Sequence, residues 1–144
     1  MSEYELRVAA GDDLAAIRGL LRGAGLPVPG ADEAVRFVVA VRAGNVVAVA
    51  GWEVHDAHAL LRSVTVRESE RGGGVGARVV ADALRAIEAE GVRQAYLVTM
   101  DAADFFGRFG FRTIAREDVA LPIRSSREYQ IHECVGGQWM ERRR

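Results

Sequence analysis

Apolar residues along this chain recur at two spacings, one typical of α-helices and one typical of β-strands. Over residues 14–24 they fall on one helical face, which predicts a helix that begins at Asp12 or Asp13 and ends at Gly25. Residues 75–90 show the helical pattern most clearly. Strands are predicted over residues 5–9, 37–42, 46–54, 59–66, 95–99, 111–115 and 137–142.

Shorter signals connect these elements. Residues 43–46 predict a hairpin turn, and residues 32–36 and 122–130 predict further helical segments. Asp101 and Asp104 have the spacing of a capping box at the start of a short helix. The order of strands and helices therefore predicts an α/β fold.

Length and composition narrow the class of protein. The chain has 144 residues, 49% hydrophobic and 27% charged, with a formal net charge of -1. These values predict a single domain over residues 1–144. The balanced charge disfavours nucleic-acid binding, and the longest apolar runs are shorter than the roughly 20 residues of a membrane span. The N-terminal residues do not resemble an export signal, and Cys134 has no second cysteine to pair with. A cytoplasmic protein is expected, with a structural role for Cys134.

The most unusual stretch is RGGGVGA, residues 71–77, which leads into the helix at 75–90. A helix that begins in this way directs its first backbone amides at one spot, where the helix dipole also favours negative charge. Glycines let a bulky anion approach that spot, and Arg71 adds a positive charge. The stretch therefore predicts a phosphate or pyrophosphate site, and an ordinary flexible loop is the simpler alternative.

Two other nucleotide-binding motifs fit less well. A Walker P-loop requires a lysine followed by Ser or Thr after its last glycine, whereas Ala77 and Arg78 follow Gly76. The Rossmann pattern G-x-G-x-x-A is matched by Gly72, Gly74 and Ala77, but the residues RESE separate it from the preceding strand. The strands before it also read as an antiparallel meander, which the Rossmann fold does not use.

The glycine stretch after the strand LLRSVTV and the later stretches AYLVT and ADFFGRFGF form two motifs. Their sequences and their order resemble those of the GNAT (Gcn5-related) family of N-acetyltransferases. The family's acetyl-CoA motif, Q/R-x-x-G-x-G/A, is matched by Arg71, Gly74 and Gly76 after the strand LLRSVTV. The next motif of the family is matched by AYLVT followed by ADFFGRFGF. LLRSVTV, YLVT, FFGRFGF, IRSS and the closing GQWMER further resemble the arsenic-resistance N-acetyltransferases and, more distantly, the acetyltransferase domain of N-acetylglutamate synthase.

The resemblance implies a fold and a cosubstrate. The fold is a central, mostly antiparallel mixed sheet flanked by helices, with a β-bulge or splay that admits acetyl-CoA between the strands at 59–66 and 95–99. Acetyl-CoA would lay its pantetheine arm along the first of these strands and its pyrophosphate on the amides of residues 72–77, and no metal is expected. The residues that the resemblance assigns to acetyl-CoA are Val64, Thr65, Val66, Arg71, Gly72, Gly73, Gly74, Val75, Gly76, Ala77 and Phe106.

The resemblance also implies a mechanism and candidate catalytic residues. The family reaction is direct attack of an amine on the thioester, helped by a base and by an acid that meets the leaving thiolate. Many members have a tyrosine as the acid where this chain has Phe106. Thr99 is the candidate to hydrogen-bond the thiolate or an ordered water, and Glu53 is the candidate base, with His55 second. Ordinary strand positions for Thr99 and Glu53 stay open as alternatives.

Arg62 is the candidate residue for the acceptor. It interrupts the apolar run LLRSV and would be costly to bury without a partner. We expect it to bind a carboxylate or another oxyanion of the acceptor, or else to form a structural salt bridge with Glu53 or another carboxylate. Trp52 is a candidate wall of the acceptor pocket, with a core position as the alternative.

The expected function is acetylation of a primary amine, in particular an α-amine, on a small amino-acid-like molecule. Resistance to arsenic or to a toxic amino acid is the role that the subgroup resemblance implies. A non-catalytic acyl-CoA-binding or regulatory module is one alternative, and acetylation of protein N-termini or lysines is another. The resemblance leaves a homodimer open and gives no reason to expect nucleic-acid or membrane partners.

Overall fold

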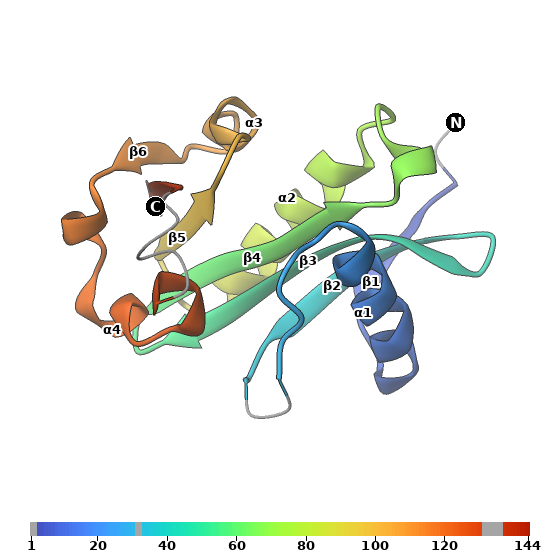
Figure 1. Cartoon of the computed structure of the whole chain (residues 1–144), viewed down its shortest axis with the longest axis horizontal. Helices are drawn as coiled ribbons and strands as arrows, with labels where there is room; N and C mark the ends of the chain where they lie inside the picture. Colours follow the sequence, from blue (N-terminus) through green and yellow to red (C-terminus); the bar gives the residue numbers. More distant parts are fainter. Residues whose placement is uncertain (1–2, 31–32, 131–136) are drawn as a thin grey trace. The chain divides into compact units, whose positions relative to one another are not determined.

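The computed structural model describes residues 3–30, 33–130 and 137–144. Strands and helices follow one another much as the sequence predicts (Figure 1). The elements are β1 (Glu5–Val8), α1 (Leu14–Gly23), β2 (Arg36–Arg42), β3 (Asn45–His55), β4 (His58–Val66), α2 (Val75–Ala89), β5 (Gln94–Thr99), α3 (Ala103–Gly107), β6 (Arg112–Ile114), α4 (Leu121–Arg124) and β7 (Gln138–Arg143).

The described strands form a seven-stranded sheet in the order β1-β2-β3-β4-β5-β7-β6. The pairs β1–β2, β2–β3, β5–β7 and β6–β7 are antiparallel, and β4–β5 is parallel. The predicted fold class, a mostly antiparallel mixed sheet with helices, is thus confirmed.

The chain divides into two compact units, and each is described by itself. Unit 1 comprises Met1–Glu53 and Ser63–Ala86, and unit 2 comprises Val54–Arg62 and Ile87–Arg144. Strand β4 contributes residues to both units. Neither unit is therefore one continuous segment of sequence.

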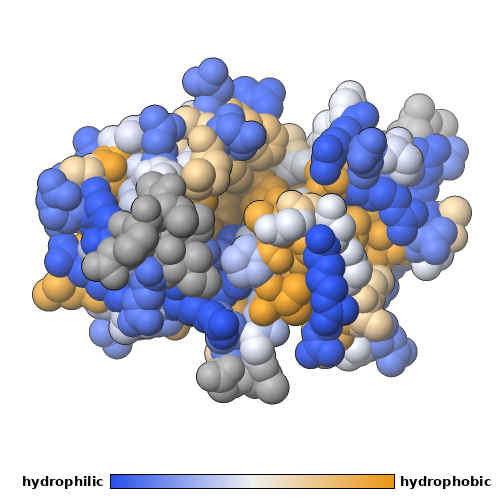
Figure 2. Space-filling model, viewed as in Figure 1, coloured by the Kyte–Doolittle hydropathy of each residue, from blue (hydrophilic) through white to orange (hydrophobic). Residues whose placement is uncertain are grey.

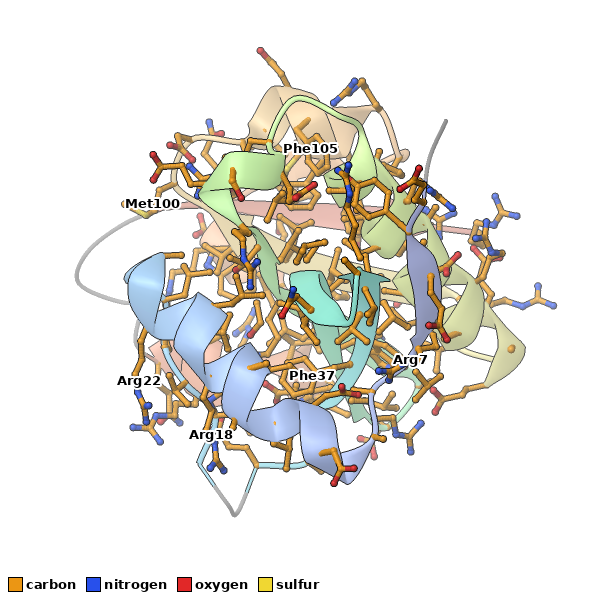
Figure 3. The ribbon with its side chains drawn as sticks, turned by 90° about the vertical axis from the view of Figure 1, so that its right-hand side faces the viewer. Arg7, Arg18, Arg22, Phe37, Met100 and Phe105 are labelled. Carbon is orange, nitrogen blue, oxygen red and sulfur yellow. The ribbon has the colours of Figure 1, made fainter. Side chains whose placement is uncertain are left out.

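One part of the core of unit 1 is formed by α1 and the strands β2 and β3. Ile17 and Leu21 lie on one face of the helix and pack against Phe37, Val39 and Val49. Figure 3 shows Phe37 beneath α1, while Arg18 and Arg22 extend from the outer face of the helix. The helical spacing of the apolar residues therefore has the packing role that the pattern predicts.

Two predictions for unit 1 have different outcomes. The hairpin turn is confirmed, because Ala43 and Gly44 join β2 to β3 with φ angles of 51° and 80°, as a tight two-residue turn requires. The helix predicted at 32–36 is wrong over its described residues, because no helix begins after Glu33 and Arg36 already starts β2. The β-branched run that follows favours the strand.

Asp13 precedes α1, as predicted, but its side chain does not cap that helix. Instead, its Oδ2 accepts hydrogen bonds from the Ala10 amide at 2.7 Å and from Arg7 Nη1 at 2.6 Å. The hydrogen bond from Arg7 is the main cause that lowers the pKa of Asp13. This carboxylate therefore fixes the connection between β1 and α1.

The core of unit 2 contains aromatic side chains from β5, β7 and the helical region after β6. Tyr96, Tyr129 and Trp139 pack with Leu60 and Ile123 in one buried cluster. The Tyr129 and Trp139 rings lie 5.4 Å apart, in the range of stabilising aromatic pairs. This cluster holds the helical region after β6 against the strands of unit 2.

The helical predictions for unit 2 need two corrections. The helix expected at 122–130 is interrupted after α4, where the Ser125 hydroxyl donates to the Pro122 carbonyl at 2.9 Å, and a second helical turn covers 127–130. The capping box of Asp101 and Asp104 does not form at α3, whose first flanking residue has no side-chain cap. The closing strand near the end of the chain is confirmed as β7.

Unit 2 contains a buried carboxylate, Glu141. Glu141, 3% exposed, accepts hydrogen bonds from the Tyr96 hydroxyl at 2.8 Å and from Arg112 at 3.1 Å, and Arg143 Nε lies 3.0 Å from it. Burial alone raises the pKa of Glu141, but its hydrogen bonds to Arg143, Tyr96 and Arg112 outweigh burial and keep that pKa below its ordinary value. The Glu141 carboxylate is therefore charged, and it binds Tyr96, Arg112 and Arg143 inside unit 2.

In the part of the chain that the structure describes, no helix is both long enough and apolar enough to cross a membrane. Figure 2 shows hydrophilic and hydrophobic residues side by side at the surface, and the exposed large apolar side chains include Met100 and Leu121. The expected structural role of Cys134 concerns a position outside the described residues.

Candidate functional site

The glycine-rich stretch forms an exposed loop that ends at α2. Gly72 and Gly74 have φ angles of 88° and 83°, which residues with a side chain rarely adopt. A Cβ atom on either glycine would meet no other atom within 4 Å. Glycine is therefore required here by the backbone conformation, and the space beside the backbone is open to a ligand.

The backbone of this loop can act as a binding group. The Arg78 amide bonds to the Gly74 carbonyl at 3.3 Å and closes the first turn of α2, and Val75 is buried and anchors that turn. The N–H groups that precede Arg78 in the first turn have no carbonyl partner within a helix. They can donate to an anion, which the helix dipole also attracts.

Arg71 stabilises the start of the loop. Its Nε donates to the Val66 carbonyl at the end of β4, at 3.2 Å, so one edge of the guanidinium is bonded to the strand. The side chain is exposed. The predicted contribution of Arg71 to anion binding would have to come from its remaining nitrogens.

A second group of side chains, which the sequence analysis missed, lies against the glycine loop. The Tyr4 hydroxyl donates to Glu70 at 2.8 Å, and Arg42 donates to the same carboxylate at 3.0 Å. The guanidinium carbons of Arg42 and Arg78 lie 5.7 Å and 5.9 Å from the centre of the Tyr4 ring. A Cβ on Gly73 would lie 3.7 Å from the Tyr4 hydroxyl. We call Tyr4, Arg42, Glu70 and Arg78 the loop cluster.

The strand predicted to accompany the pantetheine arm has an irregular backbone. In unit 2, the parallel register of β4 with β5 runs from His58 opposite Gln94 to Leu60 opposite Tyr96. Ser63, further along β4, has a φ of 60°, a conformation that costs a residue with a side chain about 1 kcal/mol or more. This local irregularity is of the kind that the resemblance implies for the strand.

The β4 residues assigned to acetyl-CoA come directly after Ser63. Val64 and Val66 are half-buried, whereas Thr65, the residue between them, is buried. The Thr65 hydroxyl is buried and has no hydrogen-bond partner among the described residues. The roles of these three residues toward acetyl-CoA stay predictions.

Two of the other candidates, Trp52 and Glu53, lie in β3 within unit 1. Trp52 is 3% exposed, which fits the core position weighed as its alternative role. Glu53 is 7% exposed, so it is not the solvent-facing strand residue that the sequence left open. A buried carboxylate on a strand is a candidate proton acceptor, and its role as the base stays a prediction.

Thr99 and Phe106 lie in unit 2. The Thr99 hydroxyl oxygen accepts a hydrogen bond from the Ala102 amide at 3.0 Å, so it shapes the turn before α3 where a capping box was expected. The hydroxyl hydrogen can still be donated to another group. Phe106 is buried and contacts Phe105 and Phe111 edge-on, with ring centres 5.0 Å and 6.2 Å away.

Arg62 is buried in unit 2 and has a buried carboxylate partner. Its Nε lies 3.6 Å from Glu128 Oε1, and the side chains are 2% and 9% exposed. The salt bridge weighed as an alternative for Arg62 therefore exists, with Glu128 as the carboxylate. A distance of 3.6 Å is longer than a direct hydrogen bond, so the contact is an ion pair.

The predicted site residues are thus distributed over both units. Unit 1 holds the glycine loop, the end of β4, Trp52 and Glu53, and unit 2 holds Arg62, Thr99 and Phe106. Within the described residues, no three His, Cys, Asp or Glu side chains are grouped as a metal site requires. Within unit 1, the backbone amides and arginines at the glycine loop are groups that can bind an anion.

Comparison with known proteins identifies the family. The family model described as acetyltransferase (GNAT) domain matches residues 33–113, more than half of the chain. The chain belongs to the GNAT acetyltransferase family. The predicted enzyme class, an acetyl-CoA-dependent N-acetyltransferase, is confirmed by this membership. Comparison with curated protein sequences gives no match.

Solved structures share the fold at low sequence identity. Rv2747 from Mycobacterium tuberculosis, in complex with CoA, is 21% identical with a TM-score of 0.81, over 97% of this chain and 99% of that one. N-acetylglutamate synthase from Neisseria gonorrhoeae, in complex with CoA and L-arginine, is 17% identical with a TM-score of 0.78, over 99% of this chain and 34% of that one. An acetyltransferase of the GNAT family from Staphylococcus aureus Mu50 is 14% identical with a TM-score of 0.75, over 97% and 98%. The chain spans about a third of the length of the synthase.

Proposed function

We propose that this chain transfers the acetyl group of acetyl-CoA to the primary amine of a small amino-acid-like acceptor. The observation that carries the proposal is the glycine loop, where open backbone at Gly72 and Gly74 leads into the first turn of α2. In this proposal the pyrophosphate of acetyl-CoA lies on the amides of residues 72–77, where backbone donors and the helix dipole both favour an anion. The CoA present in the structures of Rv2747 and N-acetylglutamate synthase supports the same cosubstrate.

The reaction proposed is a direct acyl transfer. The neutral amine attacks the thioester carbonyl carbon, a C–N bond forms, the C–S bond breaks, and CoA leaves as a thiolate that takes up a proton. Glu53 accepts the proton that the amine loses, either directly or through a water molecule. Thr99 donates its hydroxyl hydrogen toward the leaving sulfur, while the same oxygen accepts from the Ala102 amide.

An amino-acid-like acceptor is supported by two considerations. An α-amine has a pKa near 7.7–8.0 against about 10.4 for a lysine side chain, so less work is needed to deprotonate it at neutral pH. An α-carboxylate accompanies that amine, and Arg62 is the buried cation proposed to bind it, in exchange for part of its contact with Glu128. The resemblance to arsenic-resistance acetyltransferases extends the proposal to amino-acid-like molecules that carry an arsenic oxyanion.

Two other functions compete with this proposal. A non-catalytic acyl-CoA-binding module would bind CoA but turn over none of a panel of amines. A protein acetyltransferase would acetylate peptides faster than free amino acids. An assay of one preparation with both kinds of acceptor separates all three.

Replacement of Gly74 by valine tests the cosubstrate site. We expect Gly74→Val to raise the Kd for CoA at least about tenfold, because a β-branched residue rarely adopts a φ of 83° and its side chain would occupy the proposed pyrophosphate position. The measurement is isothermal titration calorimetry, with NAD as a second ligand. The matched control is Gly19→Val, in the exposed part of α1 with open space at its Cβ. Unchanged CoA affinity in Gly74→Val, or tighter binding of NAD than of CoA, contradicts the proposal.

The acceptor is tested at Arg62. We expect Arg62→Ala to raise KM for an amino acid much more than KM for the matching amino-acid amide, and Arg62→Lys to recover little, because an ammonium lacks the planar fork. Since Arg62→Ala leaves Glu128 buried without its partner, the double variant Arg62→Met/Glu128→Gln provides a version without an uncompensated charge. Equal effects on the amino acid and its amide would make Arg62 a structural residue.

A further inference from the structure

The loop cluster extends the candidate anion site beyond the glycine backbone. Its members come from three separate parts of unit 1: Tyr4 from the N-terminal segment, Arg42 from the end of β2, and Glu70 and Arg78 from the two sides of the glycine loop. Glu70 offsets one of the two arginine charges, so the cluster retains an excess positive charge. Its two arginine side chains are at the surface, where a charged ligand can reach them.

We propose that Arg42 and Arg78 bind the 3′-phosphate on the adenosine of CoA, so that the enzyme distinguishes CoA from its 3′-dephospho form. This inference rests on the proposed function, in which the pyrophosphate lies on the glycine loop. In CoA a single ribose separates the 5′-pyrophosphate from the 3′-phosphate. The second phosphate must therefore lie close to the loop, and the loop cluster is a cationic group that lies against the loop beside Arg71.

Tyr4 and Glu70 hold the two cations in position. Glu70 accepts from both Tyr4 and Arg42, which restricts the otherwise flexible Arg42 side chain. The Tyr4 ring lies within about 6 Å of both guanidinium groups, the range of cation–π attraction. Arginines that are already ordered lose less entropy when a phosphate binds, and the planar guanidinium matches the geometry of phosphate oxygens.

The loop cluster also contacts the glycine loop, so it can influence the conformation of that loop. Glu70 immediately precedes Arg71, and the Tyr4 hydroxyl lies next to Gly73. Tyr4 and Glu70 are therefore positioning residues for the loop as well as for Arg42. Substitutions of these two residues are expected to weaken CoA and 3′-dephospho-CoA together, whereas loss of the arginines affects CoA selectively.

The experiment compares the Kd values of CoA and 3′-dephospho-CoA by isothermal titration calorimetry, which requires no acceptor. We expect the parent protein to bind CoA about tenfold more tightly, as one charge-assisted phosphate contact gives. Arg42→Ala and Arg78→Ala should each reduce this ratio, and the double variant should bring it close to one by weakening CoA alone. The ratio should also fall at high salt, because exposed ion pairs are screened.

The matched control is Arg85→Ala, which removes an exposed arginine of α2 that pairs with Asp82. It should keep the parent's ratio. A parent ratio near one with both ligands bound, or a ratio unchanged in the double arginine variant, overturns the 3′-phosphate site and leaves the proposed function intact. If the folded parent binds neither ligand, the proposed function fails as well.

Discussion

Each unit contains a tyrosine, a glutamate and an arginine in the same bonding pattern. In unit 1, Tyr4 donates to Glu70 at 2.8 Å and Arg42 donates to it at 3.0 Å. In unit 2, Tyr96 donates to Glu141 at 2.8 Å and Arg112 donates to it at 3.1 Å. The bond lengths are nearly equal, but Glu141 and Tyr96 are almost fully buried, whereas the side chains around Glu70 are partly exposed.

This difference in burial changes what the same bonds do. Burial, followed by the bond to Glu141, raises the pKa of Tyr96 to about 12. For Tyr4, which is not buried in this way, the hydrogen bond to Glu70 is the main cause that raises the pKa of the hydroxyl. A buried carboxylate that loses its partners is costly, while an exposed one is rehydrated. The Glu141 group therefore stabilises the fold, and the Glu70 group is suited to arranging a surface for a ligand.

Replacement of Glu141 by glutamine gives the largest expected effect. Glu141→Gln removes a buried charge that accepts from Tyr96, Arg112 and Arg143, and we expect the free energy of unfolding to fall by about 3 kcal/mol. Urea unfolding followed by circular dichroism measures the change. A loss below about 1 kcal/mol would remove the contrast between the two groups.

Replacement of Tyr96 by phenylalanine gives a smaller, pH-dependent effect. Near neutral pH, Tyr96→Phe should cost about 2 kcal/mol, the value of a hydrogen bond to a charged group. The unfolded chain releases the tyrosine proton near pH 10, whereas the folded protein retains it to about 12. Between these values the parent loses stability as pH rises, and its advantage over Tyr96→Phe should shrink. Unfolding curves from pH 8 to 11 that stay parallel for the two proteins would contradict this account.

The smallest effect is expected at Glu70. Glu70→Gln should change the free energy of unfolding by less than about 1 kcal/mol, because the carboxylate and Arg42 are partly exposed. The same variant should nevertheless raise the Kd for CoA, since the Tyr4 and Arg42 contacts beside the loop are weakened. Thermal unfolding and calorimetry on one preparation test both parts. A destabilisation as large as that of Glu141→Gln would show that the two groups do not differ in role.

Most of the fold could be predicted because the relevant signals are local. Apolar spacing and turn residues were enough to predict the helix α2, the hairpin turn at residues 43–44 and the order of strands and helices along the chain. Caps and short helices were predicted less well. Asp13, Asp101 and Asp104 are residue types that often cap helices, but contacts with other parts of the chain determine which groups bond. Asp13 accepts from Arg7, and before α3 it is Thr99 that accepts a hydrogen bond from the Ala102 amide.

In the candidate site, too, local features could be predicted from the sequence and distant partners could not. The glycine loop was predictable, since consecutive glycines before a helix are a local signal with a chemical meaning. The pairing of Arg62 with Glu128 and of Tyr4 with Glu70 joins residues 66 positions apart in both cases, and no local pattern marks such partners. An arginine within an apolar strand did indicate that an anionic partner was needed, from the acceptor or from the protein, although the sequence could not identify Glu128 as that partner.

The pairing of β5 with β7 has a consequence while the chain is being made. All of the residues of unit 1 precede Ile87, but β5 pairs along its whole length with β7, which is synthesised about forty residues later. At about 5–20 residues per second, β5 waits several seconds with that edge unpaired. An apolar strand edge in this state can pair with other nascent chains. We therefore expect that a chaperone bound to unit 2 during translation slows the loss of soluble protein to aggregation.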